Sequence, residues 1–190
     1  MIKAILLAAG QSKRMKSENK LIKLYKNKPL INYSLNVLTK SKANKIIIVL
    51  GHQHKEVKKI IKKNKKNIFI YNKNFRKGMA SSIKVGLRKI TRNDKGFIIV
   101  QSDMPFIKTV DINKIFNSIK LKKFLVYVLK FKNKIGNPIG FDISLTKKFK
   151  KIKGEYGAKF MVKRLKNKTN FIKVNSSKVF KDFDLKKDFN

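Results

Sequence analysis

One carboxylate stands apart among the few acidic residues of this sequence. The chain has 190 residues, of which 49 are Lys or Arg and only 10 are Asp or Glu, so each acid can be considered by itself. Asp103 lies two residues after the apolar run 97–101 and precedes Met104 and Pro105. If the run is a strand, Asp103 lies at the carboxyl edge of a sheet, where open α/β folds bind ligands. A lone acid there suits Mg²⁺ that arrives with a nucleotide, because Mg²⁺ commonly uses one or two carboxylates plus phosphate oxygens. The alternative is a loop aspartate that caps the helix expected near Asp111.

A second group of acids lies near the end of the sequence. Asp182 and Asp184 flank Phe183, and Asp188 follows one helical turn later. These carboxylates could supply a second metal ligand or cap a last helix. Five other acids stand in helical or turn contexts, where capping or solvation accounts for them: Glu18, Glu56, Asp94, Asp111 and Asp142.

A basic loop that begins with glycine follows the first apolar run. Gly10 comes directly after this run and opens the segment 10–15, which contains Lys13 and Arg14. Backbone N–H groups and two cations in such a loop can hold a polyphosphate. The segment lacks the Gly-Lys-Ser/Thr of a P-loop and the three glycines of a dinucleotide-binding turn, so a dinucleotide cofactor is disfavoured. The alternative is an ordinary turn between a strand and a helix.

Several other kinds of chemistry find no support in the sequence. The chain has no cysteine, which excludes disulfides, thiolate zinc sites and thiol nucleophiles. His52 and His54 follow an apolar run without a Ser or Cys partner at a suggestive spacing, so no catalytic triad can be assembled. Glycine and proline make residues 136–140 and 155–157 read as turns, although glycine there would also allow close approach of a substrate.

Short apolar runs that alternate with amphipathic stretches predict the elements that position these residues. Strands are predicted over residues 4–8, 46–50 and 97–100, with weaker ones over 68–71, 124–130 and 171–174. Apolar residues at helical spacing predict helices over 30–39, 56–63, 81–90, 112–119, 145–149 and 158–165. This alternation is typical of βαβ units. We therefore expect a doubly wound α/β fold with a mostly parallel sheet and helices on both faces. No repeat, linker or change in composition divides residues 1–190, so we expect a single domain.

The net charge of +39 is the unusual feature of the composition. Such a field attracts nucleic acid or anionic lipid whatever the fold, so non-specific nucleic-acid binding is a candidate property. Only five of the 49 cations are Arg, however, and proteins that read phosphates and bases favour the guanidinium group. Lys, Asn, Ile and Phe share A/T-rich codons, which favours compositional drift as the origin of the charge. No run approaches the length of about 20 apolar residues that a membrane span needs, and the first ten residues do not resemble a signal peptide, so we expect a cytoplasmic protein without membrane partners.

Taken in order, seven segments of the chain resemble the molybdenum cofactor nucleotidylyltransferases (MobA-like NTP transferases), most closely the CTP:molybdopterin cytidylyltransferase branch. They are residues 7–15 (LAAGQSKRM) with Lys20, 28–30 (KPL), Asn72 with 78–82 (GMASS), 102–105 (SDMP), 136–138 (GNP), 154–159 (GEYGAK) and 182–184 (DFD). Four residues depart from the family pattern: Lys16 replaces Gly, Lys73 replaces Pro, Asn137 replaces His and Lys159 replaces Arg. Because left-handed backbone would strain a lysine, we predict that residue 16 adopts a conformation that a β-carbon tolerates.

The resemblance implies a Rossmann-like nucleotidyltransferase that moves CMP from CTP to molybdopterin cofactor and releases pyrophosphate in a Mg²⁺-dependent reaction. It implies catalytic roles for Arg14, Lys20 and Asp103, and binding of the metal by Asp103 and Asp184. By the same resemblance, the nucleotide is bound by Leu7, Ala8, Ala9, Gly10, Arg14, Lys20, Asn72, Gly78, Met79 and Ser82, and the acceptor by Asn137, Pro138, Gly157 and Lys159.

The resemblance leaves the substrates open. Ala9 in place of a second glycine favours CTP over GTP by family analogy alone. The alternatives are another NTP, another phosphorylated acceptor such as a sugar or alditol phosphate, or a lysine-rich module that binds nucleic acid or a membrane surface. A molybdoenzyme or a chaperone is a candidate protein partner.

Overall fold

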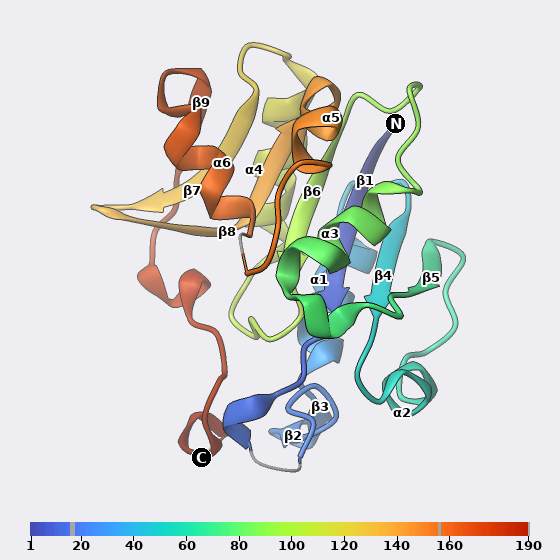
Figure 1. Ribbon diagram of the computed structural model, residues 1–190. Helices are drawn as coiled ribbons and strands as arrows, with labels where there is room; N and C mark the ends of the chain where they lie inside the picture. The colour runs from blue at the N-terminus through green and yellow to red at the C-terminus, as the bar shows by residue number, and fades with distance from the viewer. Residues whose placement is uncertain (16–17, 156, 190) are drawn as a thin grey trace.

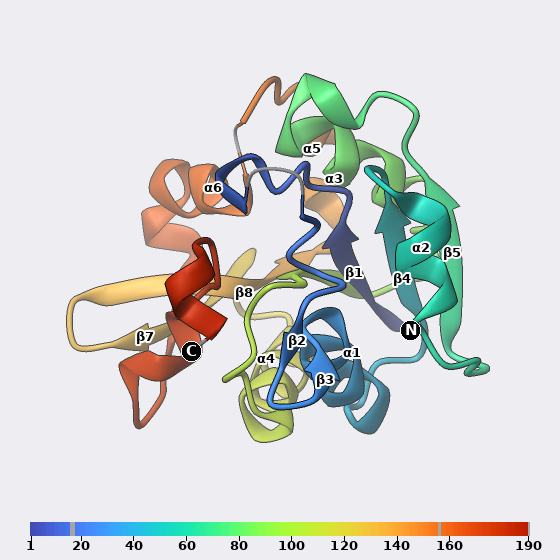
Figure 2. The same cartoon turned by 90° about the horizontal axis from the view of Figure 1, so that it is seen from below.

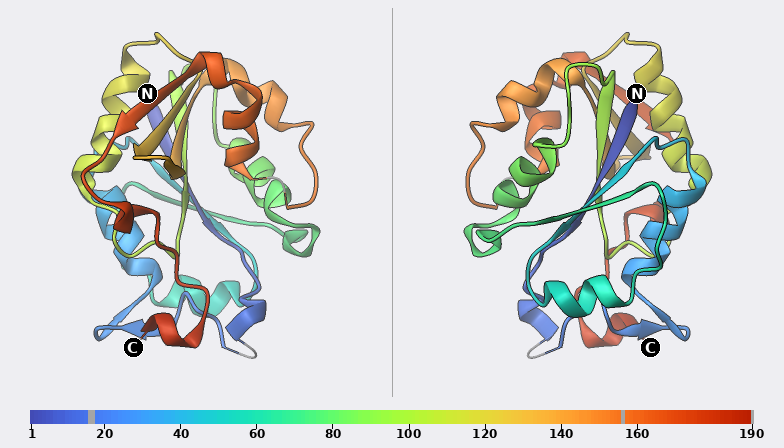
Figure 3. Two further views of the ribbon diagram at one scale, coloured as in Figure 1. Left: turned by 90° about the vertical axis from the view of Figure 1, so that its left-hand side faces the viewer. Right: turned by 90° about the vertical axis from the view of Figure 1, so that its right-hand side faces the viewer.

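Strands and helices alternate along the chain and form a layered α/β structure (Figure 1). The structure is a computed structural model that describes residues 1–15, 18–155 and 157–189. Within these ranges a sheet has the strand order β5-β4-β1-β6-β8-β7-β9, and helices cover both of its faces (Figure 3). The predicted α/β fold with a mostly parallel sheet is confirmed.

Four neighbouring strands on one side of the sheet run parallel. β1 (Ile2–Ala8) lies between β4 (Ile46–Leu50) and β6 (Gly96–Gln101), and β5 (Asn67–Tyr71) pairs with β4. On the other side, β8 (Lys134–Asp142) runs antiparallel to both β6 and β7 (Val126–Phe131), while β9 (Thr169–Lys173) pairs in parallel with β7. A short antiparallel ribbon of β2 (Leu24–Tyr25) and β3 (Lys28–Pro29) precedes the first helix.

The helices form two layers because side chains alternate across each strand. Ala4 and Leu6 of β1 belong to the core shared with α1 (Ile31–Lys40), α2 (His54–Lys59) and α4 (Thr109–Lys120). Ile5 belongs to the opposite core, shared with α3 (Met79–Leu87), α5 (Thr146–Phe149) and α6 (Ala158–Arg164). A strand buried on both faces is expected to be continuously apolar, as β4 and residues 4–8 of β1 are.

The strand order reverses at β1. After β1 the chain adds β4 and β5 on one side, and it then returns to place β6 on the other side. In open α/β sheets, the crevice outside the carboxyl ends of the strands at such a reversal is where ligands bind. The arrowheads of β1 and β4 point down toward this edge in Figure 1, and Figure 2 looks onto the edge from below. The fold therefore brings the loops that follow β1 and β6 to one crevice.

Residues 136–140 form part of β8, so the predicted turn is wrong. Pro138 lies where the register between β7 and β8 shifts, between Gly136, which pairs with β7, and Ile139, which pairs with both neighbours. A bulge tolerates a proline that a regular ladder would not. Gly140 allows α4 to pack closely, because a Cβ there would lie 2.5 Å from Ile115 Cγ2. Glycine and proline thus serve packing and a bulge here, and not a turn.

Other differences from the sequence prediction are small. The helix expected over residues 56–63 spans His54–Lys59 instead. Ile60 and Ile61 follow it, and residues 62–67 are all Lys or Asn and offer little apolar surface to extend the helix. The β2–β3 ribbon and the short 3₁₀ helices were not expected. In the described part of the chain, no helix has the length and apolar character that crossing a membrane requires.

Candidate active site

A cavity of about 490 Å³ opens at the carboxyl ends of β1 and β6. Five segments surround it: the loop after β1, the start of α3 with the turn before it, the loop after β6, the loop at Glu155 and the C-terminal segment. The oxygen of Leu7 accepts a hydrogen bond from Ser102 Oγ at 2.6 Å, which fixes the ends of the two central strands to each other. The lining residues are Leu7, Ala9, Gly10, Gln11, Ser12, Lys13, Arg14, Lys20, Leu21, Phe75, Gly78, Met79, Ser82, Gln101, Ser102, Asp103, Glu155, Asp182 and Asp184.

The loop after β1 wraps around one side of the cavity and is anchored at two points. A 3₁₀ helix, Lys13–Met15, ends in the fully buried side chain of Met15, whose N–H donates to Ser12 O at 2.8 Å. Ser12 Oγ accepts a hydrogen bond from the N–H of Lys20 at 3.1 Å, which closes the loop. The prediction for Lys16 lies outside the described residues. The loop thus presents Lys13 and Arg14 to the cavity from a fixed base.

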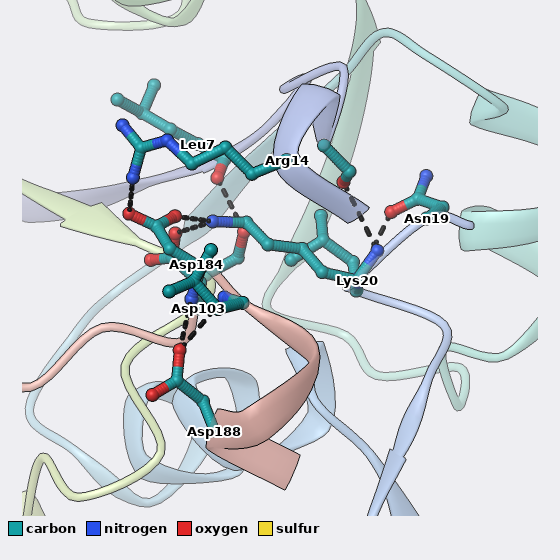
Figure 4. A network of polar contacts seen from close by, with 11 residues as sticks. Leu7, Arg14, Asn19, Lys20, Asp103, Asp184 and Asp188 are labelled. Atoms are coloured by element: carbon teal, nitrogen blue, oxygen red, sulfur yellow. Dashed lines mark hydrogen bonds and ion pairs between the residues drawn. The ribbon is translucent and has the colours of Figure 1, made fainter. Parts of the chain in front are cut away.

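A basic side chain and two carboxylates meet in the cavity (Figure 4). Lys20 Nζ lies 2.5 Å from Asp103 Oδ2 and 2.7 Å from Asp184 Oδ1. Arg14 Nη1 lies 2.6 Å from the other oxygen of Asp184. The side chains of Lys20 and Asp103 are 13% and 14% exposed, whereas Arg14 is largely exposed. Residues separated by 83 and 164 positions in the sequence therefore form one charged cluster.

Burial and charge act in opposite directions on these groups. Burial lowers the pKa of the Lys20 ammonium, but the two carboxylates outweigh burial and raise that pKa above its ordinary value. Burial raises the pKa of Asp103, an effect that Lys20 offsets only in part and that the charge of Asp182 reinforces. Burial alone would also raise the pKa of Asp184, but Lys20 and Arg14 outweigh burial and lower it. Lys20 therefore stabilises the charged forms of both carboxylates, and the carboxylates stabilise its ammonium, in a partly desolvated place.

The C-terminal segment carries Asp184 to the site through Phe183. The ring of Phe183 is 1% exposed and packs edge-on against Tyr25 and Phe106, with centroids 4.9 Å and 5.8 Å away. Its N–H donates to Asp103 O at 3.0 Å. Because side chains alternate in extended chain, burial of Phe183 leaves the flanking Asp182 and Asp184 free to face the cavity, which both of them line.

The opposite side of the cavity is the start of α3, which a neighbouring loop covers. Gly78 has φ +90°, and a Cβ there would lie 2.5 Å from Gly154 O. Ala80 N–H donates to the same Gly154 oxygen at 3.0 Å, and Met79 N–H donates to Glu155 Oε2 at 3.3 Å. Residues 154 and 155 therefore accept hydrogen bonds from the N-terminus of α3, and these bonds place the Glu155 carboxylate at the cavity.

Asn72 fixes the first turn of α3 through side-chain hydrogen bonds. Asn72 directly follows β5 and is only 1% exposed. Asn72 Nδ2 donates to Ser81 Oγ at 2.8 Å and to Ser82 Oγ at 3.0 Å, and Asn72 Oδ1 accepts from Asn74 N–H at 3.0 Å. Asn72 thus fixes the position of Ser82, which lines the cavity, and does not line it itself.

The structure brings together most of the residues that the sequence singled out. Of the expected catalytic, metal and nucleotide residues, Ala8 and Asn72 lie outside the cavity lining. The others line it: Leu7, Ala9, Gly10, Arg14, Lys20, Gly78, Met79, Ser82, Asp103 and Asp184.

The four expected acceptor residues lie outside this cavity lining but close to the same edge of the sheet. Asn137 and Pro138 belong to the part of β8 that extends beyond its pairing with β6. Gly157 contacts the start of α3, since a Cβ there would lie 2.7 Å from Met79 Sδ. Lys159 reaches Gly136, whose added Cβ would lie 3.7 Å from Lys159 Cε. The buried Oδ1 of Asn137 makes no hydrogen bond within the described residues.

Other lining residues were not named as site residues from the sequence. Glu155 and Asp182 stood in motifs whose neighbours were selected, and Asp182 was also considered as a second metal ligand, so their acidic side chains were the available signal. Leu21, Phe75 and Gln101 carried no such signal, because an apolar or amide side chain at a strand end or in a turn is common in any α/β protein.

Residues 4–169 match the family of the MobA-like NTP transferase domain. The chain belongs to this family. The match runs from the third residue of β1 to the first residue of β9, and it includes the carboxyl ends of the two strands that form the cavity. The resemblance seen in the sequence is thereby confirmed at the level of the family and of nucleotidyltransferase chemistry, whereas the molybdenum-cofactor branch is a finer assignment.

Named relatives of this MobA-like protein include two called bifunctional protein GlmU. The one from Thermosipho melanesiensis is 36% identical over 107 residues, which are 56% of this chain and 22% of that protein. The one from Clostridioides difficile is 30% identical over 140 residues, which are 73% of this chain and 29% of that protein. The chain thus spans less than a third of the length of either relative.

Solved structures show the same fold at low identity. Rv0371c from Mycobacterium tuberculosis H37Rv has a TM-score of 0.87 at 19% identity, covering 99% of this chain and 95% of that one. Rv0371c in complex with manganese has a TM-score of 0.76 at 16% identity, covering 92% and 89% of the two chains. A 4-diphosphocytidyl-2C-methyl-D-erythritol synthase from Anaerococcus prevotii has a TM-score of 0.78 at 15% identity, covering 100% and 92%.

Proposed function

We propose that this MobA-like protein transfers CMP from CTP to molybdopterin cofactor and releases pyrophosphate. The observation that carries the proposal is the cluster of Lys20, Asp103 and Asp184 at the carboxyl ends of β1 and β6, opposite the basic loop after β1. Nucleotidyl transfer depends on positioning and on neutralising phosphate charge, and this cavity supplies cations and metal-ligating carboxylates in one place.

In this proposal the loop after β1 and Lys20 handle the triphosphate. The backbone N–H groups around Gly10 bind phosphate oxygens, and a phosphate has room to approach them because nothing lies within 4 Å of the place where a Cβ of Gly10 would be. Arg14 and Lys20 offset the negative charge that grows on the α-phosphate and on the departing pyrophosphate. Phe75 and Met79 also line the cavity, and their apolar side chains offer a surface suited to the nucleotide base.

Asp103 and Asp184 fit a divalent cation. Among the described residues no three His, Cys, Asp or Glu side chains are arranged to hold a metal, but two carboxylates suffice for Mg²⁺ when phosphates supply other ligands. Asp103 and Asp184 converge on one point, now marked by Lys20 Nζ, and Asp103 Oδ1 is buried without a hydrogen bond in the described structure. When bound there, Mg²⁺ would neutralise charge on the triphosphate and orient it.

The reaction is an in-line displacement. An oxygen of the acceptor phosphate forms a bond to the α-phosphorus while the bond from that phosphorus to the pyrophosphate oxygen breaks. The attacking phosphate is already anionic, so the step requires no general base. This agrees with a cavity whose described lining contains neither His nor Cys.

A second acceptor class is favoured by one observation. Asn137 and Lys159 differ from the His and Arg of the molybdenum-cofactor branch, and both lie in the region beside β8 assigned to the acceptor. A different phosphorylated acceptor, such as a sugar or alditol phosphate, is therefore the alternative. The structural similarity to a 4-diphosphocytidyl-2C-methyl-D-erythritol synthase is compatible with it.

Ligand-dependent stabilisation tests which nucleotide is bound. The protein is melted with Mg²⁺ and CTP, GTP, ATP or UTP at several salt concentrations, since a ligand at 100 times its dissociation constant adds about 2.7 kcal/mol. Stabilisation by CTP alone supports the proposal. Equal stabilisation by all four that fades as salt rises would favour the alternative of a lysine-rich anion-binding module, because such binding is electrostatic.

Pyrophosphate release then identifies the acceptor. The protein is incubated with the preferred nucleotide and Mg²⁺, and with molybdopterin, a sugar phosphate, an alditol phosphate or no acceptor. Release with molybdopterin, and its loss in Asp103→Asn, is the expected result. Release with another acceptor alone would replace the molybdopterin assignment while keeping the nucleotidyltransferase.

A further inference from the structure

The ammonium of Lys20 lies at the place where the two carboxylates would hold a cation. Its Nζ is 2.5 Å from Asp103 Oδ2 and 2.7 Å from Asp184 Oδ1 (Figure 4). A divalent cation bound to the same two oxygens would require the same lone pairs and the same space. The ammonium and the metal therefore exclude each other at these oxygens.

The carboxylates hold Lys20 firmly. Its side chain is only 13% exposed, and its Nζ contacts one oxygen of Asp103 and one oxygen of Asp184. The N–H of Lys20 is fixed to Ser12 Oγ, which keeps the start of the side chain at the loop while leaving its four-carbon stem free to swing. Arg14 is held in a similar way, with Nη1 2.6 Å from Asp184 Oδ2. Both cations assigned to the triphosphate are thus paired with carboxylates assigned to the metal.

The pairing also explains why the carboxylates tolerate each other. Two partly buried carboxylates that face one point repel each other unless a cation lies between them. Lys20 is that cation in this protein. A triphosphate that attracts Lys20 would remove it and leave a site that needs a new cation.

We propose that Lys20 is an internal counter-ion whose movement couples nucleotide binding to metal binding. Bound to the carboxylates, Lys20 blocks the divalent cation; drawn to the phosphates of the nucleotide, it exposes both oxygens to the metal. Nucleotide and metal then bind with positive cooperativity, and by linkage each raises the affinity for the other by the same factor. This inference rests on the proposed function, because it takes the nucleotide and metal as ligands of the same cavity.

The test measures binding of Mn²⁺ alone, without nucleotide, by titration followed with electron paramagnetic resonance. Removing Lys20 as Lys20→Met should tighten Mn²⁺ binding by at least about tenfold over the wild type. Lys13→Met is the matched control, because Lys13 also lines the cavity but contacts neither carboxylate in the described structure. It removes the same charge and should change Mn²⁺ affinity much less. Adding Asp103→Asn to Lys20→Met should abolish the gain.

The outcomes separate this inference from the proposed function. If Lys20→Met binds Mn²⁺ no more tightly than Lys13→Met, while Asp103→Asn weakens binding in the wild type, the counter-ion role is wrong and the metal site stands. If neither the wild type nor any variant binds Mn²⁺, and the wild type releases no pyrophosphate with any nucleotide, the proposed function fails as well. If Lys20→Met does not fold by circular dichroism, Lys20→Gln replaces it, since an amide can still donate to one carboxylate.

Discussion

Lys3 and Asp94 form an ion pair inside the protein, far from the cavity, with Lys3 Nζ 2.8 Å from Asp94 Oδ2. Their side chains are 8% and 0% exposed, and the same Asp94 oxygen accepts hydrogen bonds from Thr91 N–H and Oγ1. The pair joins the first strand to the turn that precedes β6. Lys3→Met should therefore cost about 3 kcal/mol of unfolding free energy, because it leaves a buried carboxylate without its cation. Urea unfolding measures the loss. The double variant Lys3→Met/Asp94→Asn should recover part of it, and an unchanged stability in Lys3→Met would contradict the role of the pair.

The same pair predicts how stability depends on pH. Burial alone would raise the pKa of Asp94, but hydrogen bonds from Lys3 and Thr91 outweigh burial and lower it. Because the folded pKa lies below the unfolded one, the contribution to stability is present at neutral pH and is lost as the pH falls through the folded value. In Lys3→Met most of the lowering is lost, so the variant should lose less stability than the wild type as the pH falls, and the difference in unfolding free energy between the two proteins should narrow in acid. Unfolding curves between neutral pH and about pH 3 compare the two proteins, with equal acid dependence as the contrary result.

Asp103→Asn should reduce turnover by at least about a hundredfold while the protein stays folded. The substitution keeps the shape of the side chain but removes the charge that faces Lys20 and the proposed metal. The fold should persist because Lys20 keeps Asp184 as its partner. Pyrophosphate release and a thermal melt check the two halves of the prediction. Turnover within a few-fold of the wild type would remove Asp103 from the reaction and favour a binding module.

The sheet could be predicted largely from its local sequence, because residues 4–8 of β1, the whole of β4 and residues 97–100 of β6 are continuous apolar runs. β8 could not be predicted in this way, because Gly136, Pro138 and Gly140 are residues typical of turns. The bulge at Pro138 depends on pairing with β7, and the close packing at Gly140 depends on α4. Neither could the ribbon β2–β3, whose strands of two residues are too short for periodicity to show.

The candidate site likewise has a part that the sequence predicts and a part that it does not. Asp103 could be selected from the sequence because an acid just past a buried strand has few other roles. Its pairing with Lys20 and Asp184 could not be derived from spacing, since it depends on Phe183 bringing the C-terminal segment back to the loop after β6. The family resemblance supplied what spacing could not. The resemblance also assigned Asn72 to the nucleotide. In the structure the buried amide of Asn72 donates a hydrogen bond to Ser82 Oγ, and Ser82 lines the cavity.

Gly78 and Gly10 are predicted to differ in their tolerance of a methyl group. Gly78→Ala should destabilise the protein by about 1–3 kcal/mol, because residue 78 has φ +90° and its new Cβ would press against Gly154 O. The new Cβ should also push residues 154 and 155 away from the start of α3, which displaces the Glu155 carboxylate and raises the KM for the nucleotide. Thermal melts and initial rates measure the two effects, and a stable variant with an unchanged KM would contradict both.

Gly10→Ala is the matched substitution on the other side of the cavity. Nothing lies within 4 Å of its added Cβ, so stability should change by less than about 0.5 kcal/mol. If phosphates approach this backbone as proposed, nucleotide affinity should nevertheless fall. A variant that binds nucleotide as tightly as the wild type would place the triphosphate elsewhere.

Asp188 is predicted to act on the reaction only by positioning Asp184. Its Oδ2 accepts hydrogen bonds from the N–H groups of Asp184 and Leu185, both at 2.9 Å, while its side chain lies on the far side of Asp184 from Lys20 (Figure 4). Asp188→Ala should weaken Mn²⁺ binding and lower kcat by about tenfold, since outer partners of metal ligands typically contribute that much. Asp188→Asn should restore both, because its amide oxygen can accept the same two hydrogen bonds. Lys181→Met removes the 3.9 Å ion pair to Asp188 and the contact of Lys181 Nζ with the Phe183 ring, 5.3 Å from the ring centroid, and it should have little effect because the Lys181 side chain is half exposed. If the alanine and asparagine variants are equally impaired, the charge of Asp188 matters and not its backbone contacts, and the positioning role is wrong.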